Sequence, residues 1–551
     1  MKKNFLPFAM CAVFLSVSAN ASAQRDARQA DKKVISNDSL EVKKAKGSER
    51  NVMLNASDAT KPREIQIGLP SEDVNVYENG LPAVYSSAVH KLQYHWRSDA
   101  SLGEVGLMTP SESAIRTGNI AYSVDSSSKL GQKEFKGILN YKANHFGLQQ
   151  FDLNVSGGIG NNWLYSGSVY QTFDPGTFDV KFDEYADRMQ ISRAGLTRFF
   201  NNRKGKASLM YKYAYSRNSG NELNAAPFIY VGDGSIKEIP GFEPGLASYG
   251  PTSGEIEYLD IMDGKMKKAN LRDLEDNRSH EVTFLTDYTF DSGLKWNLDM
   301  KYMTAPEANY VDFGGSTISE LTESDGYTLS DGTPYAGLVE GRRTWLHFGK
   351  VKNFLVTSEL AQRFGNHQMR LGLNEWYYHL DYHSSSFQWT GSVQEYPEIL
   401  TAPDGSRFRG FNELSPEYTK GYENKLALYL TDDWQGSPKL NIYYGARLEY
   451  QALRGENAAV TNANGEYVGR FANYYLGATA PDGTKIAPTS MSYDWLNYAL
   501  TAAVTYKLTK EFGFTGDFTY ITQHPKIENF APATLPNTDK ISVPLGRAGI
   551  Y

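Results

Sequence analysis

The sequence has one cysteine, no excess of basic residues and only one apolar run of any length. Among its 551 residues, 56 are Lys or Arg and 63 are Asp or Glu, which gives a formal net charge of −7. A nucleic-acid-binding protein needs a basic face, so this balance argues against that class. A helical membrane protein with several spans needs several apolar runs of about 20 residues. Beyond residues 1–23 the sequence has none, which excludes that class as well.

The apolar run at the N-terminus has the features of a secretory signal peptide. Two lysines precede the short apolar stretch 5–17, and an Ala-Ser-Ala signal-peptidase site ends at Ala23. Cleavage after Ala23 predicts an exported chain. The only cysteine, Cys11, lies in the segment to be removed, so we expect no disulfide in the mature chain. Residues 24–50 are polar, charged and without periodicity, and they predict a flexible periplasmic arm.

Aromatic residues and glycine are abundant instead. The 37 Tyr, 27 Phe and 49 Gly are typical of large antiparallel β proteins, including transmembrane barrels. Apolar and polar residues alternate in many segments; for example, Leu294, Trp296 and Leu298 alternate with Lys295 and Asn297. Because side chains two apart in a strand share a face, this pattern predicts strands with one apolar and one polar face.

Strand length and connection length indicate a membrane barrel. The chain after residue 130 has about thirteen such segments, most of them roughly 10–14 residues long, as tilted membrane strands require. Short turns alternate with long connections, and outer-membrane barrels have this asymmetry between periplasmic turns and extracellular loops. The predicted fold class is therefore all-β, a transmembrane antiparallel β-barrel. The long connections are expected at 218–278, 305–349, 384–420 and 453–492.

One predicted hairpin resembles a family. The sequence YLTDDW, a short turn with Pro438, and the sequence LNIYYGARLEY follow each other between residues 429 and 450. They resemble a hairpin of the TonB-dependent outer-membrane receptors, in which Gln/Asp-Asp-x-Trp precedes Leu-x-Leu-x-x-Gly-x-Arg-x-Glu/Asp-Tyr. The matching positions are Asp433, Trp434, Gly445, Arg447 and Tyr450.

Residues 63–87 resemble the plug domain of the same family. The sequence VNVYENGLP matches the strand-Asp-Gly-x-Pro motif at Gly80 and Pro82, with Asn79 in the place of the aspartate. Gly68 is not preceded by the family's arginine, and no clear TonB box lies upstream. These departures from the family pattern affect the expectation of energy coupling through TonB, and they do not affect the prediction of a barrel.

The resemblance implies a small N-terminal plug inside a barrel. The expected organisation is a signal peptide at 1–23, the arm at 24–50, a plug-like domain at 51–130 and the barrel at 131–551. Plugged outer-membrane transporters have 22 strands, so about thirteen strands would make the barrel incomplete. Several prolines and glycines, including Pro544, predict that residues 523–551 form an unfinished surface loop. We therefore expect a truncated gene product or fragment.

The resemblance also implies a function. A receptor in the Gram-negative outer membrane would bind a small nutrient at its extracellular loops and import it into the periplasm. The expected partners are outer-membrane lipid, the TonB–ExbB–ExbD energy-coupling complex and a surface lipoprotein, and no cofactor is expected. The alternatives are a porin-like or binding barrel that does not engage TonB, and a non-functional truncated fragment.

Aromatic residues in the expected long loops are the candidate ligand-binding residues. Flat aromatic side chains are stacking platforms for sugars or amphipathic ligands. Mutual packing of the loops, or an aromatic girdle at the membrane interface, would explain them as well. The candidates are Phe387, Trp389, Phe408, Phe411 and Tyr475.

Catalytic and metal-binding patterns are weak. His379, Asp381 and His383 share one face if their segment is extended. The two histidines would then be roughly 13 Å apart, too far to chelate one ion, so only a pair that includes Asp381 could hold a metal. Hydrogen-bonded lumen or rim residues are the alternative. No nucleophile elbow, phosphate-binding loop or zinc-protease pair is visible, so the sequence predicts a protein that is not an enzyme.

Overall fold

The computed structural model describes most of the chain after residue 74. The signal peptide, the arm, Gly68 and Tyr475 lie outside the described residues. Within these, no helix is both long and apolar enough to cross a membrane. The described residues are 75–84, 91–120, 123–176, 181–218, 229–230, 233, 235–237, 239, 251–394, 396–412, 417–461, 467–469, 476–479, 483, 485–509, 512–531 and 538–550.

A small mixed sheet comes first in the chain. Its strands lie in the order β2-β1-β4-β3, with β1 parallel to β4 and antiparallel to β2. Asn79 and Gly80 both have positive φ, 57° and 75°, as the two central residues of a tight hairpin turn require. The strands are β1 (Asn75–Glu78), β2 (Leu81–Pro82), β3 (Leu102–Met108) and β4 (Ser123–Ser128).

Two helices accompany this sheet, α2 (Leu92–His95) and α3 (Pro110–Thr117). At the start of α3 the Thr109 side chain accepts a hydrogen bond from the Glu112 amide, and proline occupies the first helical position. Gly118, at φ 74°, ends the helix. The small sheet has a core of its own, formed by Val76, Ala83, Trp96, Leu102 and Val124.

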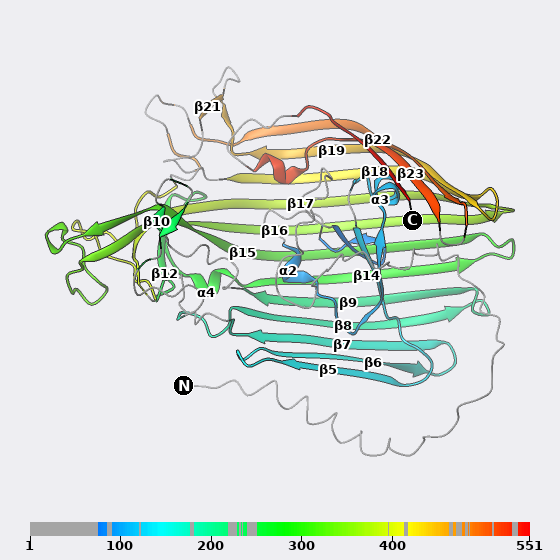
Figure 1. Ribbon diagram of the computed structural model, residues 1–551, viewed down its shortest axis with the longest axis horizontal. Helices are drawn as coiled ribbons and strands as arrows, with labels where there is room; N and C mark the ends of the chain where they lie inside the picture. The colour runs from blue at the N-terminus through cyan, green and yellow to red at the C-terminus, as the bar shows by residue number, and fades with distance from the viewer. Residues whose placement is uncertain are drawn as a thin grey trace, which may run out of the picture. The chain divides into compact units, whose positions relative to one another are not determined.

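Most of the described residues after β4 form a 14-stranded antiparallel sheet (Figure 1). Its strands pair in chain order, because each hairpin places consecutive alternating segments side by side. The strands are β5 (Lys136–Ala143), β6 (Gln149–Ile159), β7 (Trp163–Asp174), β8 (Asp187–Phe200), β9 (Gly205–Arg217), β14 (Asn277–Thr289), β15 (Lys295–Leu321), β16 (Gly337–Phe364), β17 (His367–Ser392), β18 (Tyr418–Gln435), β19 (Leu440–Asn457), β22 (Thr489–Lys507), β23 (Gly513–Gln523) and β24 (Ile541–Ile550).

The fold class predicted from the alternation is confirmed, but the strand count is corrected. The predicted surface loop at 523–551 contains β24, which pairs with β23 from Phe514↔Ile550 to Gln523↔Ile541. Pro544 is tolerated there because β24 is an edge strand, where a missing N–H costs no ladder bond on the open side. Within the described residues β5 and β24 each pair on one side only, so the sheet is not closed.

Three central strands are much longer than expected. β15, β16 and β17 have 27, 28 and 26 residues. The connection expected at 305–349 is therefore mostly strand, and the connection expected at 384–420 begins only after Ser392. In the extension of β17 the alternation is lost because both faces are buried, as at the adjacent residues Ser384 and Ser385.

The long connections carry short elements at one end of the sheet. The strand β12, the helix α4 and the extended parts of β15 to β17 share one buried apolar cluster. These elements are β10 (Ile229–Tyr230), β11 (Ile236–Lys237), β12 (Glu255–Asp260), β13 (Lys265–Asn270), α4 (Leu271–Leu274), η3 (Glu323–Asp325), β20 (Val460–Thr461), β21 (Tyr467–Gly469) and η4 (Ile527–Phe530).

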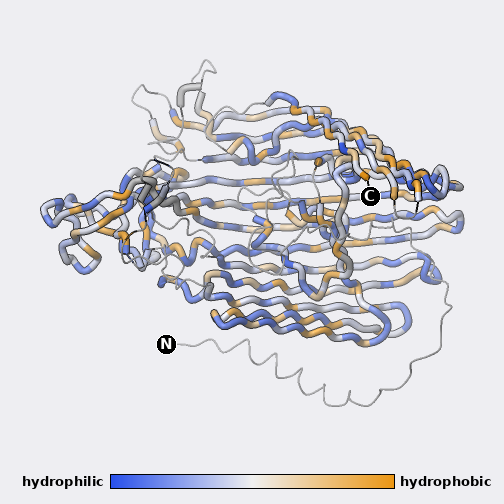
Figure 2. The backbone as a smooth tube through the Cα atoms, viewed as in Figure 1, coloured by the Kyte–Doolittle hydropathy of each residue, from blue (hydrophilic) through white to orange (hydrophobic). Residues whose placement is uncertain are grey.

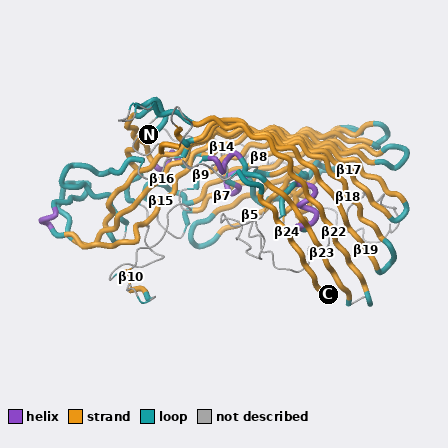
Figure 3. The backbone as a smooth tube through the Cα atoms, turned by 90° about the horizontal axis from the view of Figure 1, so that it is seen from above, coloured by secondary structure: helices purple, strands orange, loops and turns teal. Residues whose placement is uncertain are grey.

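The two faces of the large sheet differ in chemistry. Hydrophilic and hydrophobic residues alternate along its strands (Figure 2). One face packs against α2 and α3 (Figure 3) and is called the inner face. The other, outer face exposes large apolar side chains, among them Leu196, Leu209, Val282, Leu373, Leu426, Leu428, Leu448, Leu496 and Leu500. This is the division expected of a sheet with lipid on one side.

We expect Leu428→Arg to destabilise the protein in lipid vesicles by about 2–4 kcal/mol, because the outer-face side chain lies near the middle of β18. Met266→Arg, in the β12–β13 hairpin, is the control, since Met266 is 51% exposed and Leu428 is 54% exposed. Urea unfolding in vesicles measures both. Equal effects of the two substitutions would show that the outer face does not meet hydrocarbon.

Candidate functional site

A buried charge cluster holds the small N-terminal domain, here called the plug, against the inner face of the large sheet. It unites two carboxylates of the plug with charged side chains of four neighbouring strands, three cations and one carboxylate. All six side chains are almost fully buried. They are Glu78 and Asp99 of the plug, Arg193 of β8, Lys212 of β9, Glu281 of β14 and Lys301 of β15.

The charges of this cluster balance, with three cations against three carboxylates. Lys212 Nζ lies 3.0 Å from Glu78 Oε2 and 3.5 Å from Glu281 Oε2. Arg193 Nε lies 3.6 Å from Glu78 Oε1, and its Nη1 pairs with Asp99. Lys301 Nζ lies 3.7 Å from Glu281 Oε2. Buried charges are tolerated only when they are paired in this way.

Glu78 is the plug residue on which the cluster converges. Burial alone would raise the pKa of its carboxyl, but the attraction of Lys212 and Arg193 is stronger and holds that pKa well below its usual range. Glu78 is therefore ionised in the docked plug.

Helix α2 is held by polar groups of β14 and its surroundings. Tyr94 donates a hydrogen bond to Glu275 over 3.2 Å. His95 Nδ1 lies 2.9 Å from Ser279 Oγ, and His95 Nε2 contacts the carboxylate of Glu307. All of these groups are buried, so undocking α2 would expose each of them to water.

Helix α3 is held by the hairpin that resembles the receptor family. Arg447 Nη1 donates to the carbonyl oxygens of Ile115 and Arg116, over 3.3 and 3.2 Å. These carbonyls belong to the last turn of α3, where a cation also interacts favourably with the helix dipole. The carboxylate of Glu449 pairs with the same guanidinium.

Gly445 makes the close approach of α3 possible. A Cβ at this position would lie 2.9 Å from the Leu430 carbonyl oxygen and 3.3 Å from Ile115 Cγ1. The first distance is too short for a real contact, so any side chain would have to displace the strand or the helix. The Gly-x-Arg pair of the family hairpin is thus a plug contact, a role that the sequence match by itself did not reveal.

Arg116 forms a further contact between α3 and the large sheet. Its guanidinium lies 3.1 Å from Glu112 and 4.0 Å from Glu359 on β16. Glu359 also pairs with Arg370 over 2.7 Å and accepts a hydrogen bond from Tyr429 over 3.0 Å. Sequence reasoning missed these residues because they come from distant segments with no local motif.

The other motif residues lie in different surroundings. Pro82, in β2, accepts a hydrogen bond from Lys301 through its carbonyl oxygen. Asp433 accepts a hydrogen bond from Asn441, and Trp434 stacks on His367 with ring centroids 5.6 Å apart. Tyr450 lies on the outer face and donates to Asp494.

Four of the five candidate ligand-binding aromatics pack against one another. Phe387 and Phe408 meet edge to face with centroids 5.2 Å apart, and Phe411 packs beside them. Trp389 donates to Thr344 Oγ1 over 2.9 Å. Phe387 and Trp389 belong to the extended part of β17 and are buried, as is Phe408.

The candidate metal-binding residues share one face, as expected from the alternation. That face is the outer face, around the middle of the 26-residue strand β17. Asp381 lies 3.5 Å from Lys420, and His383 lies 3.8 Å from Asp260 and stacks on Phe348. No group of three or more potential metal ligands, His379 included, occurs among the described residues.

The segment after β23 enters the space on the inner side of the sheet. The Ile527 amide donates to Glu423 over 2.7 Å, and Gln451 donates to the Pro525 carbonyl oxygen over 3.0 Å. Ile527 and Phe530 are fully buried in an apolar cluster that also contains Tyr77 of the plug. The first part of the predicted surface loop is therefore an internal packing segment.

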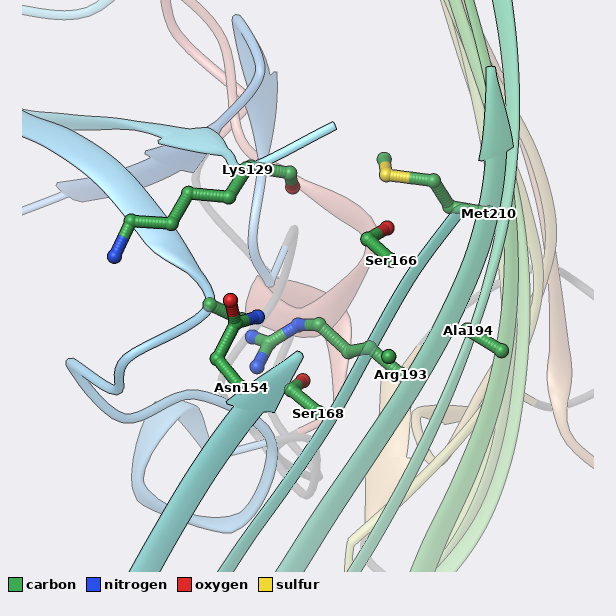
Figure 4. A pocket seen from close by; sticks show the side chains of 10 residues that line it. Lys129, Asn154, Ser166, Ser168, Arg193, Ala194 and Met210 are labelled. Carbon is green, nitrogen blue, oxygen red and sulfur yellow. The ribbon is translucent and has the colours of Figure 1, made fainter. Parts of the chain in front are cut away.

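A small polar pocket lies at the junction of plug and sheet (Figure 4). Ser101, Ser128 and Lys129 line it from the plug side, and Asn154 and Arg193 line it from the sheet. The polar side chains of this pocket adjoin Arg193 of the charge cluster, and Ala194 and Met210 also line it.

A small domain seated against the inner face of a large antiparallel sheet is the arrangement of barrels with a plugged lumen. No family model and no curated protein matches the sequence. In structure, the chain is similar to the ferric-catecholate import receptor Fiu from E. coli K12 in its closed form, with a TM-score of 0.56 and 13% identity, over 87% of this chain and 63% of that chain. The siderophore receptor PiuA from Acinetobacter baumannii gives 0.53 and 12%, over 86% and 62%.

The fold is thus that of the TonB-dependent receptors, as the hairpin motif predicted. The chain spans less than two thirds of the length of these two receptors.

We expect Glu78→Gln to weaken plug docking by about 3–5 kcal/mol, because it leaves three buried cations with two carboxylates. Glu112→Gln is the matched control. It removes only an ion pair within α3 whose side chains are partly exposed, and should cost about 0.5 kcal/mol or less. Pulse proteolysis of the plug across a urea series measures both. A change for Glu78→Gln as small as that for Glu112→Gln would show that the cluster does not hold the plug.

Plug docking should also weaken in acid. The pKa of Glu78 is lower in the docked plug than its ordinary value of 4.5. Its contribution is therefore complete above about pH 4.5 and is lost as the pH falls toward the docked-state value. The same proteolysis assay, repeated at pH 7, 5 and 4, should show a smaller pH dependence in Glu78→Gln. An identical slope in wild type and variant would contradict this assignment.

Proposed function

We propose that the protein is an outer-membrane receptor that binds a nutrient on the side of the long connections and admits it past a releasable plug. The observation that carries this proposal is that buried, balanced charges and hydrogen bonds attach the plug to the sheet, beside apolar contacts of Tyr77, Leu81 and Ile115. Such groups regain strong interactions with water when they separate, whereas an apolar interface would not. Polar contacts between the plug and the inner face are therefore compatible with a plug that docks and undocks.

The position of β1 supports energy coupling through the N-terminal arm. β1 is the first described strand, and Glu78 is its last residue. A pull on the chain before Asn75 would act on β1 directly and would reach the Glu78 cluster within four residues. Energy from the TonB–ExbB–ExbD complex, delivered to residues 24–50, would then be spent on separating Glu78 from Lys212 and Arg193.

The substrate class that we propose is a small iron chelate. Fiu is a ferric-catecholate import receptor and PiuA is a siderophore receptor, so these compounds are the first probes to test. The ligand-binding loops would pack on the buried aromatic side chains of Phe387, Trp389 and Phe408. Tyr475 remains a candidate contact residue, and a surface lipoprotein remains a candidate partner at the same end of the sheet.

The outer face and the similar structures support an outer-membrane location. The exposed leucines of the outer face would contact lipid, and the similar structures are transport receptors rather than enzymes. We accordingly propose a transport role without a catalytic step.

Deletion of residues 24–50 separates this proposal from a passive barrel. Cells that depend on the protein for uptake of a ferric chelate should lose active import when the arm is deleted, and also when the TonB complex is absent. Uptake of radiolabelled iron measures the effect, and outer-membrane fractionation controls for protein level. Uptake that continues after the deletion and needs no TonB would favour a porin-like barrel.

Plug movement can be tested with a reversible tether. Ser111 of α3 and Thr519 of β23 lie with their hydroxyl oxygens 3.3 Å apart. We expect the double variant Ser111→Cys with Thr519→Cys to form a disulfide, because side chains this close suit the geometry of that bond. The oxidised protein should lose import and regain it after reduction, while each single variant should import normally. Undiminished import by the fully cross-linked protein would show that this helix does not leave the sheet.

A further inference from the structure

Three arginines gather on the outer face, at the end of the sheet that carries the long connections. Arg188 is the second residue of β8, Arg217 is the last residue of β9, and Arg278 is the second residue of β14. These three strands are neighbours in the sheet (Figure 1). None of the three arginines takes part in the contacts that seat the plug.

The alternation of each strand places these arginines on the outer face. Along β8, Arg188 is an even number of residues from Leu196, whereas the intervening Met189 and Ile191 are buried on the inner face. Arg217 has the same relation to Leu209 on β9, as does Arg278 to Val282 on β14. Leu196, Leu209 and Val282 are all exposed large apolar residues.

The electrostatics of the cluster are unbalanced. Arg188 and Arg217 lie directly opposite each other in the β8–β9 pairing. Like charges in that relation destabilise a sheet. Neither forms an ion pair with a carboxylate of the described residues, and Arg217 Nε is buried without a hydrogen-bond partner there.

The carboxylate of Asp276, two residues before Arg278, is already engaged. Arg278 Nε donates to Asp276 Oδ1 over 2.9 Å, and its Nη2 donates to Oδ2 over 2.6 Å. Both carboxylate oxygens thus accept from Arg278, and no other described carboxylate forms an ion pair with Arg188 or Arg217.

Aromatic rings lie between the arginines and the aliphatic band. The Arg188 guanidinium lies 5.7 Å from the Phe173 ring centroid and 5.9 Å from that of Tyr215. Tyr213 and His280 are paired across the strands one step nearer to the sheet centre. Such rings mark the level of the lipid head groups in a membrane barrel.

We propose that Arg188, Arg217 and Arg278 form a binding site for the phosphate group of an anionic glycolipid in the outer leaflet. Guanidinium groups bind phosphate oxygens through paired, charge-assisted hydrogen bonds. A phosphate between Arg188 and Arg217 would relieve their repulsion, and the acyl chains would lie on Leu196, Leu209 and Val282. The inference rests on the proposed outer-membrane location and adds a specific lipid to it.

The test uses the full chain, purified in a mild detergent, with bisphosphorylated lipid A as the probe. Native mass spectrometry measures lipid binding, and dephosphorylated lipid A and inorganic phosphate are the comparison ligands. We expect dephosphorylated lipid A to bind at least about tenfold more weakly. Inorganic phosphate should not displace the bound lipid, because it lacks the acyl chains.

The decisive variant is Arg188→Gln with Arg217→Gln, which should lose that preference for phosphorylated lipid. Arg198→Gln is the matched control. Arg198 also lies on the outer face of β8 and over an aromatic ring, with Trp163 at 5.3 Å, but at the opposite end of the strand. It should bind lipid A as wild type does. If the double variant does not fold, Arg217→Lys keeps the charge and should bind about tenfold more weakly than wild type.

Three results would overturn the inference. They are equal binding of both forms of lipid A, unchanged binding by the double variant, and full displacement by inorganic phosphate, which would indicate a site for a soluble anion. Fractionation of the cells from which the protein is purified distinguishes failure of the lipid-site inference from failure of the proposed function. Protein that is in the outer membrane but has no preference for phosphorylated lipid overturns the lipid site alone, whereas absence from the outer membrane overturns both.

Discussion

The structure depends on one constraint, which is that charges buried between plug and sheet must be matched. Glu78 and Asp99 of the plug would be costly in this position without Arg193, Lys212 and Lys301. In the docked state the three cations would have only Glu281 as a partner if the plug carboxylates were replaced by neutral groups. The requirement is mutual, and it fixes where the plug sits, because the cations occupy inner-face positions that the register of β8, β9 and β15 determines. The hydrogen bonds to α2 and α3 add to this placement.

Arg447 and Gly445 show the same principle in the recognisable hairpin. The glycine lets α3 approach the strand closely, and the arginine two residues later satisfies the carbonyls at the end of that helix. The two roles need adjacent inner-face positions, which explains the Gly-x-Arg spacing. The Gly-x-Arg motif of this strand is therefore explained by the contacts that the strand makes with α3.

Much of the fold could be predicted from the sequence, because alternation with a period of two depends only on which face of each strand is apolar. The prediction failed where that rule stops applying. Pro544 indicated a loop where the structure has the edge strand β24. The polar residues Ser384 to Ser386 indicated a connection where β17 continues. The plug seat could not be predicted, since Glu78, Lys212 and Glu281 are brought together only by the order of strands. The buried loop aromatics were recognised as a group, but their packing depends on hairpins far away in the chain.

The parallel pairing of β1 with β4 determines how a mechanical load would pass through the plug. β1 begins the described chain, and β4 leads after its last residue, Ser128, to the first strand of the large sheet. A force on the start of β1, resisted at the end of β4, acts along both strands in shear and loads the hydrogen bonds between them together. Strands pulled apart from one end would instead lose these bonds one at a time. The small sheet should therefore stay intact under tension. The contacts between the plug and the inner face of the large sheet should separate first.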